Sequence, residues 1–80
     1  MSEHEQLHTI IGKNIRERRE RLNLSQELLA DSCGLHRTYI GAIERGERNL
    51  TVNTLAKVAE ALGCTSIDLL AAKTLEAKKL

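Results

Sequence analysis

The residues best suited to chemistry in this sequence lie in the segment 37–45, which reads RTYIGAIER. On a helix, at about 100° per residue, its two isoleucines share one side. The opposite side carries Arg37, Thr38, Gly41 and Arg45. An arginine can donate two hydrogen bonds to guanine O6 and N7, and a threonine methyl group can touch the methyl group of thymine. The pattern therefore predicts a helix whose polar face can contact the edges of DNA bases.

Small residues on this helix suggest close contact with a partner. Gly41 and Ala42 would let the helix backbone approach a groove, and Arg37 and Thr38 lie at the N-terminal end, which enters the groove in such motifs. Two arginines and a threonine on a helix are also ordinary solvated residues. This face by itself therefore does not establish DNA contact.

The polar face must be positioned by a second helix and a tight turn. The residues Cys33-Gly34-Leu35-His36 separate two segments whose apolar residues recur with helical periodicity. A glycine just past such a run favours the left-handed backbone that ends a helix. Ser25 is well placed to cap the first of these helices, with Glu27 in its first turn complementing the helix dipole. The segment 26–45 is therefore predicted to form a helix-turn-helix, which presents its second helix to the major groove.

The whole chain has the composition of an all-α protein. Its 80 residues include 29% charged residues, no proline and one aromatic residue, Tyr39, so the core must be aliphatic. Apolar periodicity and glycine stops predict one domain, spanning 1–80, with five helices. Their expected ranges are 5–22, 25–33, 36–45, 52–62 and 66–78. The first helix is expected to bury one stripe, made of Leu7, Ile10, Ile11, Ile15 and Leu22.

Charge and motif content exclude several classes of function. The net charge of +1 argues against a nonspecific, charge-driven DNA coat, but permits a specific binder with its cations on one surface. No nucleophile–base set, glycine-rich phosphate loop or paired carboxylates are present, so we expect no enzyme activity and no cofactor. His4 and His8 lack a third ligand, so no metal site is expected.

The chain carries no signal for a membrane or for secretion. No apolar run approaches the roughly 18 residues of a membrane span, and the N-terminus lacks the layout of a signal peptide. We therefore expect a cytoplasmic protein that contacts no membrane. Its two cysteines, Cys33 and Cys64, are expected to be reduced there.

The segment 26–45 resembles the helix-turn-helix of the lambda repressor and Cro family, the Xre-like regulators. Gln26 opens the first helix, Ala30 lies where the two helices touch, and Gly34 is at the turn. The apolar positions are filled by Leu29, Cys33, Leu35, Ile40 and Ile43. The flanking segments are similar to the compact five-helix fold of this family from about 7 to 70. More narrowly, the stretch HRTYIGAIERGERNLT is similar to the controller proteins of bacterial restriction–modification systems.

The resemblance implies roles for individual residues. The expected DNA-binding residues are Gln26, Arg37, Thr38, Tyr39, Arg45, Arg48 and Asn49. Among these, Gln26 would contact a phosphate, and Arg48 and Asn49 would hold the DNA backbone. Arg19 and Glu44 match a buried ion pair that ties the first helix to the third. Glu27 and Asp31 match the acidic positions through which the lambda repressor touches RNA polymerase. A favourable interaction with the helix dipole, together with solvation, would also account for these two acidic residues.

The resemblance also implies a function. The chain is expected to be a homodimeric, sequence-specific transcriptional regulator that binds double-stranded DNA with paired half-sites and regulates its own promoter. The half-sites would lie roughly one helical turn apart. The dimer interface is expected from the fourth and fifth helices, through Ile67, Leu69, Leu70 or Leu75. Two alternatives stay open, namely an antitoxin-like protein-interaction module and a phage-type repressor.

Overall fold

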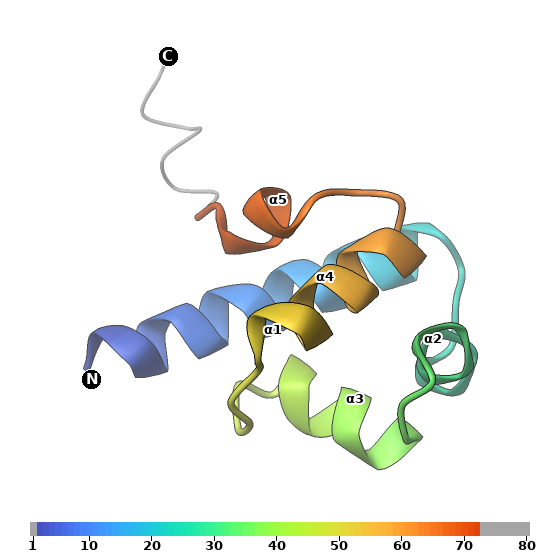
Figure 1. Ribbon diagram of the computed structural model, residues 1–80, viewed down its shortest axis with the longest axis horizontal. Coiled ribbons are helices and arrows are strands. Elements are labelled where there is room, and N and C mark those ends of the chain that lie inside the picture. The colour runs from blue at the N-terminus through green and yellow to red at the C-terminus, as the bar shows by residue number, and fades with distance from the viewer. Residues whose placement is uncertain (1, 73–80) are drawn as a thin grey trace.

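The computed structural model describes residues 2–72, which form five helices and no strand. They are α1 (Glu3–Arg21), α2 (Gln26–Cys33), α3 (Arg37–Glu44), α4 (Val52–Ala61) and α5 (Ser66–Leu70). The long α1 crosses the molecule in Figure 1, with α3 below it and α5 above it. α1 packs against α3 and α5, α2 against α3 and α4, and α4 against α5. The prediction of an all-α, five-helix fold is confirmed.

The core is aliphatic. Its buried apolar residues are Ile11, Ile15, Leu29, Ala30, Cys33, Ile40, Ile43, Leu55, Val58, Ala59, Leu62 and Leu69. The stripe expected on the first helix is only partly buried, because Leu7 is 38% exposed and Leu22 is 50% exposed. The buried part of the stripe is Ile11 and Ile15, in the middle of α1.

α1 and α3 lie close together at Gly12 of α1, which is buried. A Cβ atom placed there would overlap the backbone carbonyl oxygen of Ile43 and lie 2.8 Å from that of Glu44. Glycine inside a helix is ordinarily a mild cost. Here it is the feature that allows α1 to rest directly on the last turn of α3.

Helix ends are set by local hydrogen bonds. The Ser25 and Thr51 hydroxyls accept hydrogen bonds from backbone N–H groups and cap α2 and α4. The N-cap of α5 is Thr65, whose hydroxyl accepts from the Asp68 N–H at 3.1 Å. The Asp68 carboxylate accepts from the Thr65 N–H in return, at 2.9 Å, and this bond holds the pKa of Asp68 below its usual value.

The fifth helix is shorter than expected. The range 66–78 was predicted, but α5 ends at Leu70 and Ala71 has an extended backbone. The buried Asn14 of α1 explains this end, because its Nδ2 donates to the carbonyl oxygens of Leu69 at 2.9 Å and Ala71 at 2.8 Å. These carbonyl groups are held by α1. The remainder of the predicted helix, 73–78, lies outside the described residues.

Candidate nucleic-acid interface

A tight turn fixes the angle between α2 and α3. α2 is followed by Gly34, whose backbone is left-handed with φ of 69°. The Leu35 N–H donates to the Ala30 carbonyl oxygen at 2.9 Å, and Ala30 is only 1% exposed. α3 begins three residues after Gly34, at Arg37. The predicted helix-turn-helix is therefore confirmed.

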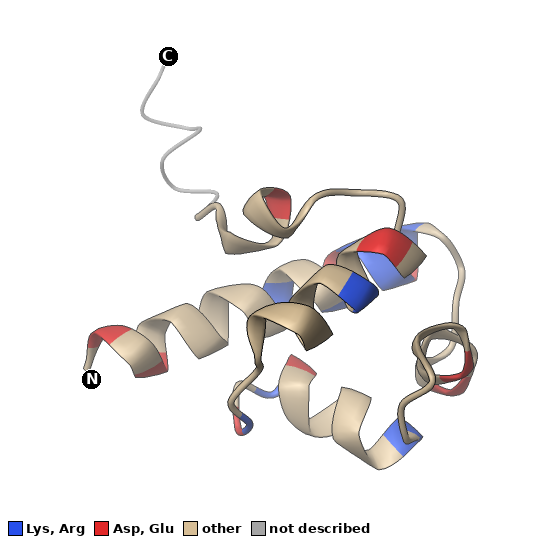
Figure 2. Cartoon of the chain, viewed as in Figure 1, with Lys and Arg blue, Asp and Glu red and all other residues tan. Residues whose placement is uncertain are grey.

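α3 buries one side and presents the other to solvent. Ile40 and Ile43 are in the core, whereas Arg37 and Thr38 are exposed at the N-terminal end of the helix. Figure 2 shows basic residues at the start of α3 and in the loop that follows it, on the side of the molecule opposite α5. This edge has the cations and hydrogen-bond donors that a DNA groove would require.

The expected role of Gly41 is wrong. This glycine was assigned to the outer face of α3, but it is buried. A Cβ atom there would lie 3.2 Å from Arg45 Nη1 and 3.5 Å from Gln26 Oε1. Its small size therefore makes room for polar side chains that fold over α3.

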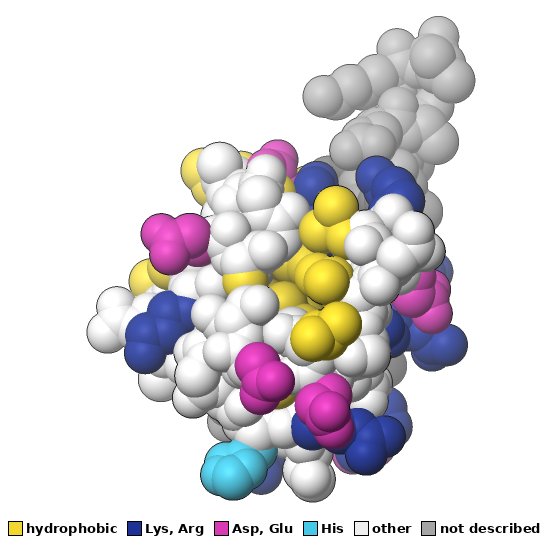
Figure 3. Space-filling view, turned by 90° about the vertical axis from the view of Figure 1, so that its right-hand side faces the viewer, with side chains coloured by type: hydrophobic (Ala, Val, Ile, Leu, Met, Phe, Trp, Pro, Cys, Tyr) yellow, Lys and Arg dark blue, Asp and Glu magenta, His cyan; other side chains and the backbone are white. Residues whose placement is uncertain are grey.

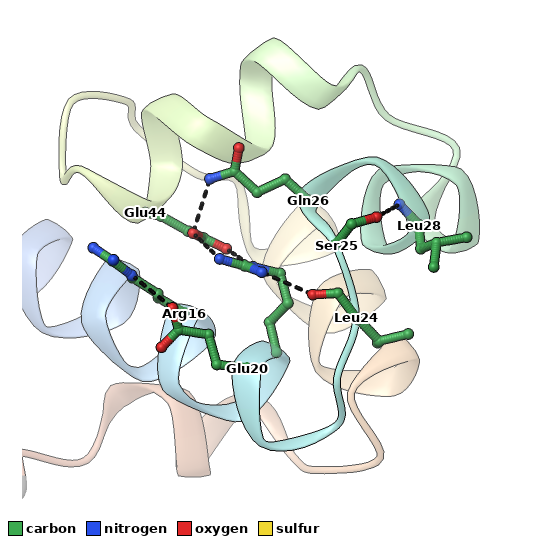
Figure 4. Close-up of polar contacts among 8 residues, drawn as sticks. Arg16, Glu20, Leu24, Ser25, Gln26, Leu28 and Glu44 are labelled. Carbon is green, nitrogen blue, oxygen red and sulfur yellow. Dashed lines mark hydrogen bonds and ion pairs between the residues drawn. The ribbon is translucent and has the colours of Figure 1, made fainter.

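Gln26 and Arg37, at the N-terminal ends of α2 and α3, line one polar groove. The amide Nε2 of Gln26 donates to Glu44 Oε1 at 3.0 Å, so one donor of this side chain is already used within the protein (Figure 4). Ser25 lines the same groove. The fold thus brings together two of the side chains that the sequence assigned to DNA.

The expected ion pair between α1 and α3 is confirmed. Arg19 Nε donates to Glu44 Oε2 at 2.7 Å and Nη2 donates to Oε1 at 3.1 Å. Arg19 Nη1 donates to the carbonyl oxygen of Leu24 at 2.7 Å, and the Glu44 side chain is only 3% exposed. Hydrogen bonding to Glu44 raises the pKa of Arg19 above its ordinary value. The pair fixes the C-terminal end of α3 against both α1 and the start of α2.

The loop after α3 is held against the helix by Tyr39. The Tyr39 hydroxyl donates to the carbonyl oxygen of Asn49 at 3.2 Å, and the Arg48 guanidinium lies 5.1 Å from the centre of the Tyr39 ring. Three of the residues expected at DNA are thereby gathered at one place. Arg45 is also exposed, but it pairs with Glu47 at 3.1 Å.

The residues expected at the dimer interface differ in exposure. Ile67 is 77% exposed and Leu70 is 39% exposed, so both are available. The expectation for Leu69 is wrong, because this side chain is fully buried between α5 and the core. Leu75 lies outside the described residues. Sequence reasoning missed Val52, which is 80% exposed at the start of α4 and lines an apolar hollow with Leu70.

A second apolar surface lies at the opposite end of the molecule, where α1 ends and α2 begins. Leu22 and Leu28 are 50% and 53% exposed. Figure 3 shows apolar side chains gathered on this end, with acidic side chains beside them. Glu27 and Asp31, one turn apart on α2, are both exposed. The sequence pattern gave no sign that these leucines would stay outside the core.

The described part of the chain was compared with the requirements of a membrane-spanning helix and of a metal site. No helix in residues 2–72 is long and apolar enough to cross a membrane. Within the same residues, no three His, Cys, Asp or Glu side chains gather in a way that could hold a metal ion.

Comparison with known proteins gives matches at the levels of family, sequence and structure. A family model described as Helix-turn-helix matches residues 15–70. The control protein C.SmaI of Serratia marcescens is 57% identical over 53 residues, which cover 66% of this chain and 63% of that protein. The match thus spans a little less than two thirds of the length of C.SmaI.

Solved structures share this fold, and two examples show the likeness. The hypothetical transcription factor NHTF from Neisseria has a TM-score of 0.87 and 34% identity, and the match covers 100% of this chain and 92% of that one. The restriction-modification controller protein C.AhdI from Aeromonas hydrophila has a TM-score of 0.75 and 40% identity, and the match covers 78% and 94% of the two chains.

Proposed function

This chain belongs to the helix-turn-helix family, and we propose that it is a sequence-specific, DNA-binding transcriptional regulator whose α3 enters the major groove. The observation that carries this proposal is the position of Arg37 and Thr38, exposed at the N-terminal end of a helix whose other side is buried. The hydrogen-bonded pair of Arg19 and Glu44 holds that helix rigidly, which is what selective base contact needs.

The likeness to C.SmaI and C.AhdI supports a narrower proposal. The chain is a controller of a restriction–modification system that acts in the cytoplasm on its own promoter. It works as a binding protein, since the exposed polar groups on α2, α3 and the loop after α3 are arranged for contact with a ligand.

The proposed DNA contacts divide into two kinds. Arg37, Thr38 and Tyr39 contact base edges, because they lie on the outer side of α3. The phosphate contacts are made by Gln26, Arg45, Arg48 and Asn49. Phosphate contacts hold the protein in register, whereas base contacts give specificity.

Replacing Arg37 tests this division. Arg37→Ala should weaken operator binding by about 1–3 kcal/mol and relax the preference at one base pair, because the two hydrogen bonds to guanine are lost. Arg37→Lys keeps the charge but not the fork, so it should relax the same preference with a smaller loss of affinity. Binding is measured by titrating the protein against its own upstream DNA, located by footprinting, and against a set of single-base variants.

Lys57→Ala is the matched control for this experiment. It removes one positive charge from an exposed position on α4, away from α3, and should leave base preference unchanged. Unchanged affinity and preference in Arg37→Ala would show that α3 is not the recognition helix.

The regulator is proposed to act as a homodimer, because one α3 contacts too few base pairs for useful specificity. Val52, Ile67 and Leu70 supply exposed apolar surface on α4 and α5. Leu7 and Leu70 line the same apolar hollow. The gathering of Leu7, Val52 and Leu70 around one hollow is typical of an association site. The proposed interface keeps Ile67 and Leu70 from the first expectation, adds Val52 and leaves out the buried Leu69.

Ile67→Asp should convert the dimer into a monomer, since it would place a charge in the proposed apolar interface. The aspartate would lie in the first turn of α5, where the helix dipole favours it, so folding should be preserved. Sedimentation measures the mass of the protein. Leu28→Asp is the control, because Leu28 is also exposed but lies at the other end of the molecule. A monomeric wild type, or a dimeric Ile67→Asp variant, would contradict the proposal.

A contact with RNA polymerase is proposed for the exposed side of α2. Glu27 and Asp31 lie beside the half-exposed Leu28, which gives an acidic surface with an apolar centre. Asp31→Asn should lower activated transcription in a purified system while operator affinity stays unchanged. Glu60→Gln, an equivalent change on α4, should affect neither. Equal activation by the Asp31→Asn variant and the wild type would contradict the proposed contact with RNA polymerase.

A further inference from the structure

α1 lies between α3, the proposed recognition helix, and α5, which supplies part of the proposed dimer interface. α1 packs against both of them, with α3 below it and α5 above it in Figure 1. Gly12 of α1 lies against the carbonyl groups of Ile43 and Glu44 in α3. Asn14 comes two residues later, so at about 100° per residue its side chain points to nearly the opposite side of α1, where it meets α5. α1 therefore relates the position of α5 to the position of α3.

α5 depends on other segments for its position. It has only five residues, Ser66–Leu70, and so short a helix is not stable without tertiary contacts. Just before it, the Cys64 N–H donates to the carbonyl oxygen of Ala59 at 2.9 Å, which ties the start of α5 to the end of α4. Leu69 anchors the helix in the core, but apolar burial is not directional. These contacts leave the C-terminal end of α5 to be fixed by another group.

Asn14 holds this C-terminal end. Its Nδ2 donates to the carbonyl oxygens of Leu69 at 2.9 Å and Ala71 at 2.8 Å, which accounts for both hydrogens of the amide group. Asn14 is 7% exposed and is the only buried polar residue among residues 2–72. Hydrogen bonds are directional, and a buried donor that loses its partners costs free energy. The two bonds therefore fix how far α5 is turned as well as where it ends.

The orientation of α5 decides what the proposed interface presents to a partner. Ile67 and Leu70 are three residues apart, so they are neighbours on one face of α5, and they are 77% and 39% exposed. Val52, the third exposed apolar residue of this surface, is on α4. A surface built from two helices keeps one shape only while the angle between the helices is fixed. A turn of α5 would change how two copies meet without changing the outer side of α3.

We propose that Asn14 is a positioning residue for operator binding, which fixes α5 against α1 and so sets the half-site spacing that the dimer accepts. The inference rests on the proposed homodimer and on the proposed DNA binding by α3. In a dimer, the interface sets the distance and the angle between the two copies of α3, and the spacing of the half-sites follows from them. Asn14 touches neither the partner subunit nor DNA and acts through α5.

The test compares the wild type with Asn14→Leu, in which a side chain of similar size has no donor. Sedimentation gives the dimer dissociation constant, which should rise about tenfold because α5 must then be ordered on association. DNA affinity is measured for a duplex with a single half-site and for the footprinted operator with its natural spacing or with one base pair inserted. The ratio of affinities for natural and altered spacing should fall towards one in the variant. Affinity for the single half-site should stay unchanged.

Two further variants assign the effect to the hydrogen bonds of Asn14. Cys33→Ala removes a sulfur atom from the core at α2, so it should lower the stability of the fold and leave the dimer dissociation constant and the spacing ratio unchanged. Asn14→Ser shortens the side chain and keeps a single donor. It should shift both quantities in the same direction as Asn14→Leu, and it carries the test if Asn14→Leu does not fold.

The outcomes separate this inference from the proposed function. Wild-type values of the dimer dissociation constant and the spacing ratio in the Asn14 variants would overturn the inference and leave the proposed function standing. An equal loss of affinity for the single half-site and the full operator would also overturn it, since the effect would then act through α3. A wild type that is monomeric, or that does not bind its upstream DNA, would overturn the proposed function together with this inference.

Discussion

Replacing Arg19 by methionine should lower the free energy of unfolding by about 3–5 kcal/mol, the usual cost of removing one partner of a buried ion pair. The Glu44 side chain is 3% exposed, and in the variant it would keep only the hydrogen bond from Gln26. Water cannot replace the two hydrogen bonds that the guanidinium supplied. Unfolding in urea, followed by circular dichroism, gives the difference in free energy.

A surface pair on the same helix provides the control. Arg16 and Glu20 are 3.3 Å apart with side chains 63% and 54% exposed, so Arg16→Met should cost less than about 1 kcal/mol. The double variant Arg19→Met, Glu44→Leu should recover much of the stability lost in the single variant, because no unpaired charge stays buried. Equal stabilities for Arg19→Met and Arg16→Met would contradict the buried pair.

Replacing Gly12 by alanine should also destabilise the protein, by about 2–3 kcal/mol. The added methyl group would meet two backbone carbonyl groups of α3, those of Ile43 and Glu44, and backbone atoms cannot rotate out of the way. α1 would have to move away from α3, which would also disturb the adjacent pair of Arg19 and Glu44. The free energy of unfolding and the affinity for DNA should therefore fall together.

Gly41→Ala is the matched control, because Gly41 is also a buried glycine inside a helix. Its added methyl group would meet the ends of two flexible side chains, Arg45 and Gln26, which can shift. The substitution should then be neutral or stabilising by up to about 1 kcal/mol, as expected when alanine replaces glycine in a helix. If the Gly12→Ala and Gly41→Ala variants had the same free energy of unfolding, this result would contradict the close contact between α1 and α3.

Much of the candidate site could be predicted from the sequence because it depends on local rules. Ser25 and Gly34 set the ends of α2 through their own backbone and cap chemistry. The 3.6-residue period then turns Ile40 inward and Arg37 outward without reference to any other segment. The helix-turn-helix is therefore determined within about twenty residues, and so is the side of α3 that faces a partner.

Burial could not be predicted in the same way, since it depends on which segments meet. Leu69 and Leu70 are adjacent and equally apolar, yet one is fully buried and the other is 39% exposed. The helical pattern allowed either to face a partner subunit. α1 decides between them, because Asn14 holds the end of α5 through the carbonyl groups of Leu69 and Ala71.

The sequence by itself thus determined the helices, the turn and the outward placement of Arg37 and Thr38, all of which follow from interactions between residues close in the chain. Only the tertiary structure decided the roles of the two helical glycines. Gly12 and Gly41 look alike in sequence, but one lies against the backbone of α3 and the other beneath movable side chains. The space beside a glycine is formed by residues distant in the chain, and no local pattern records them.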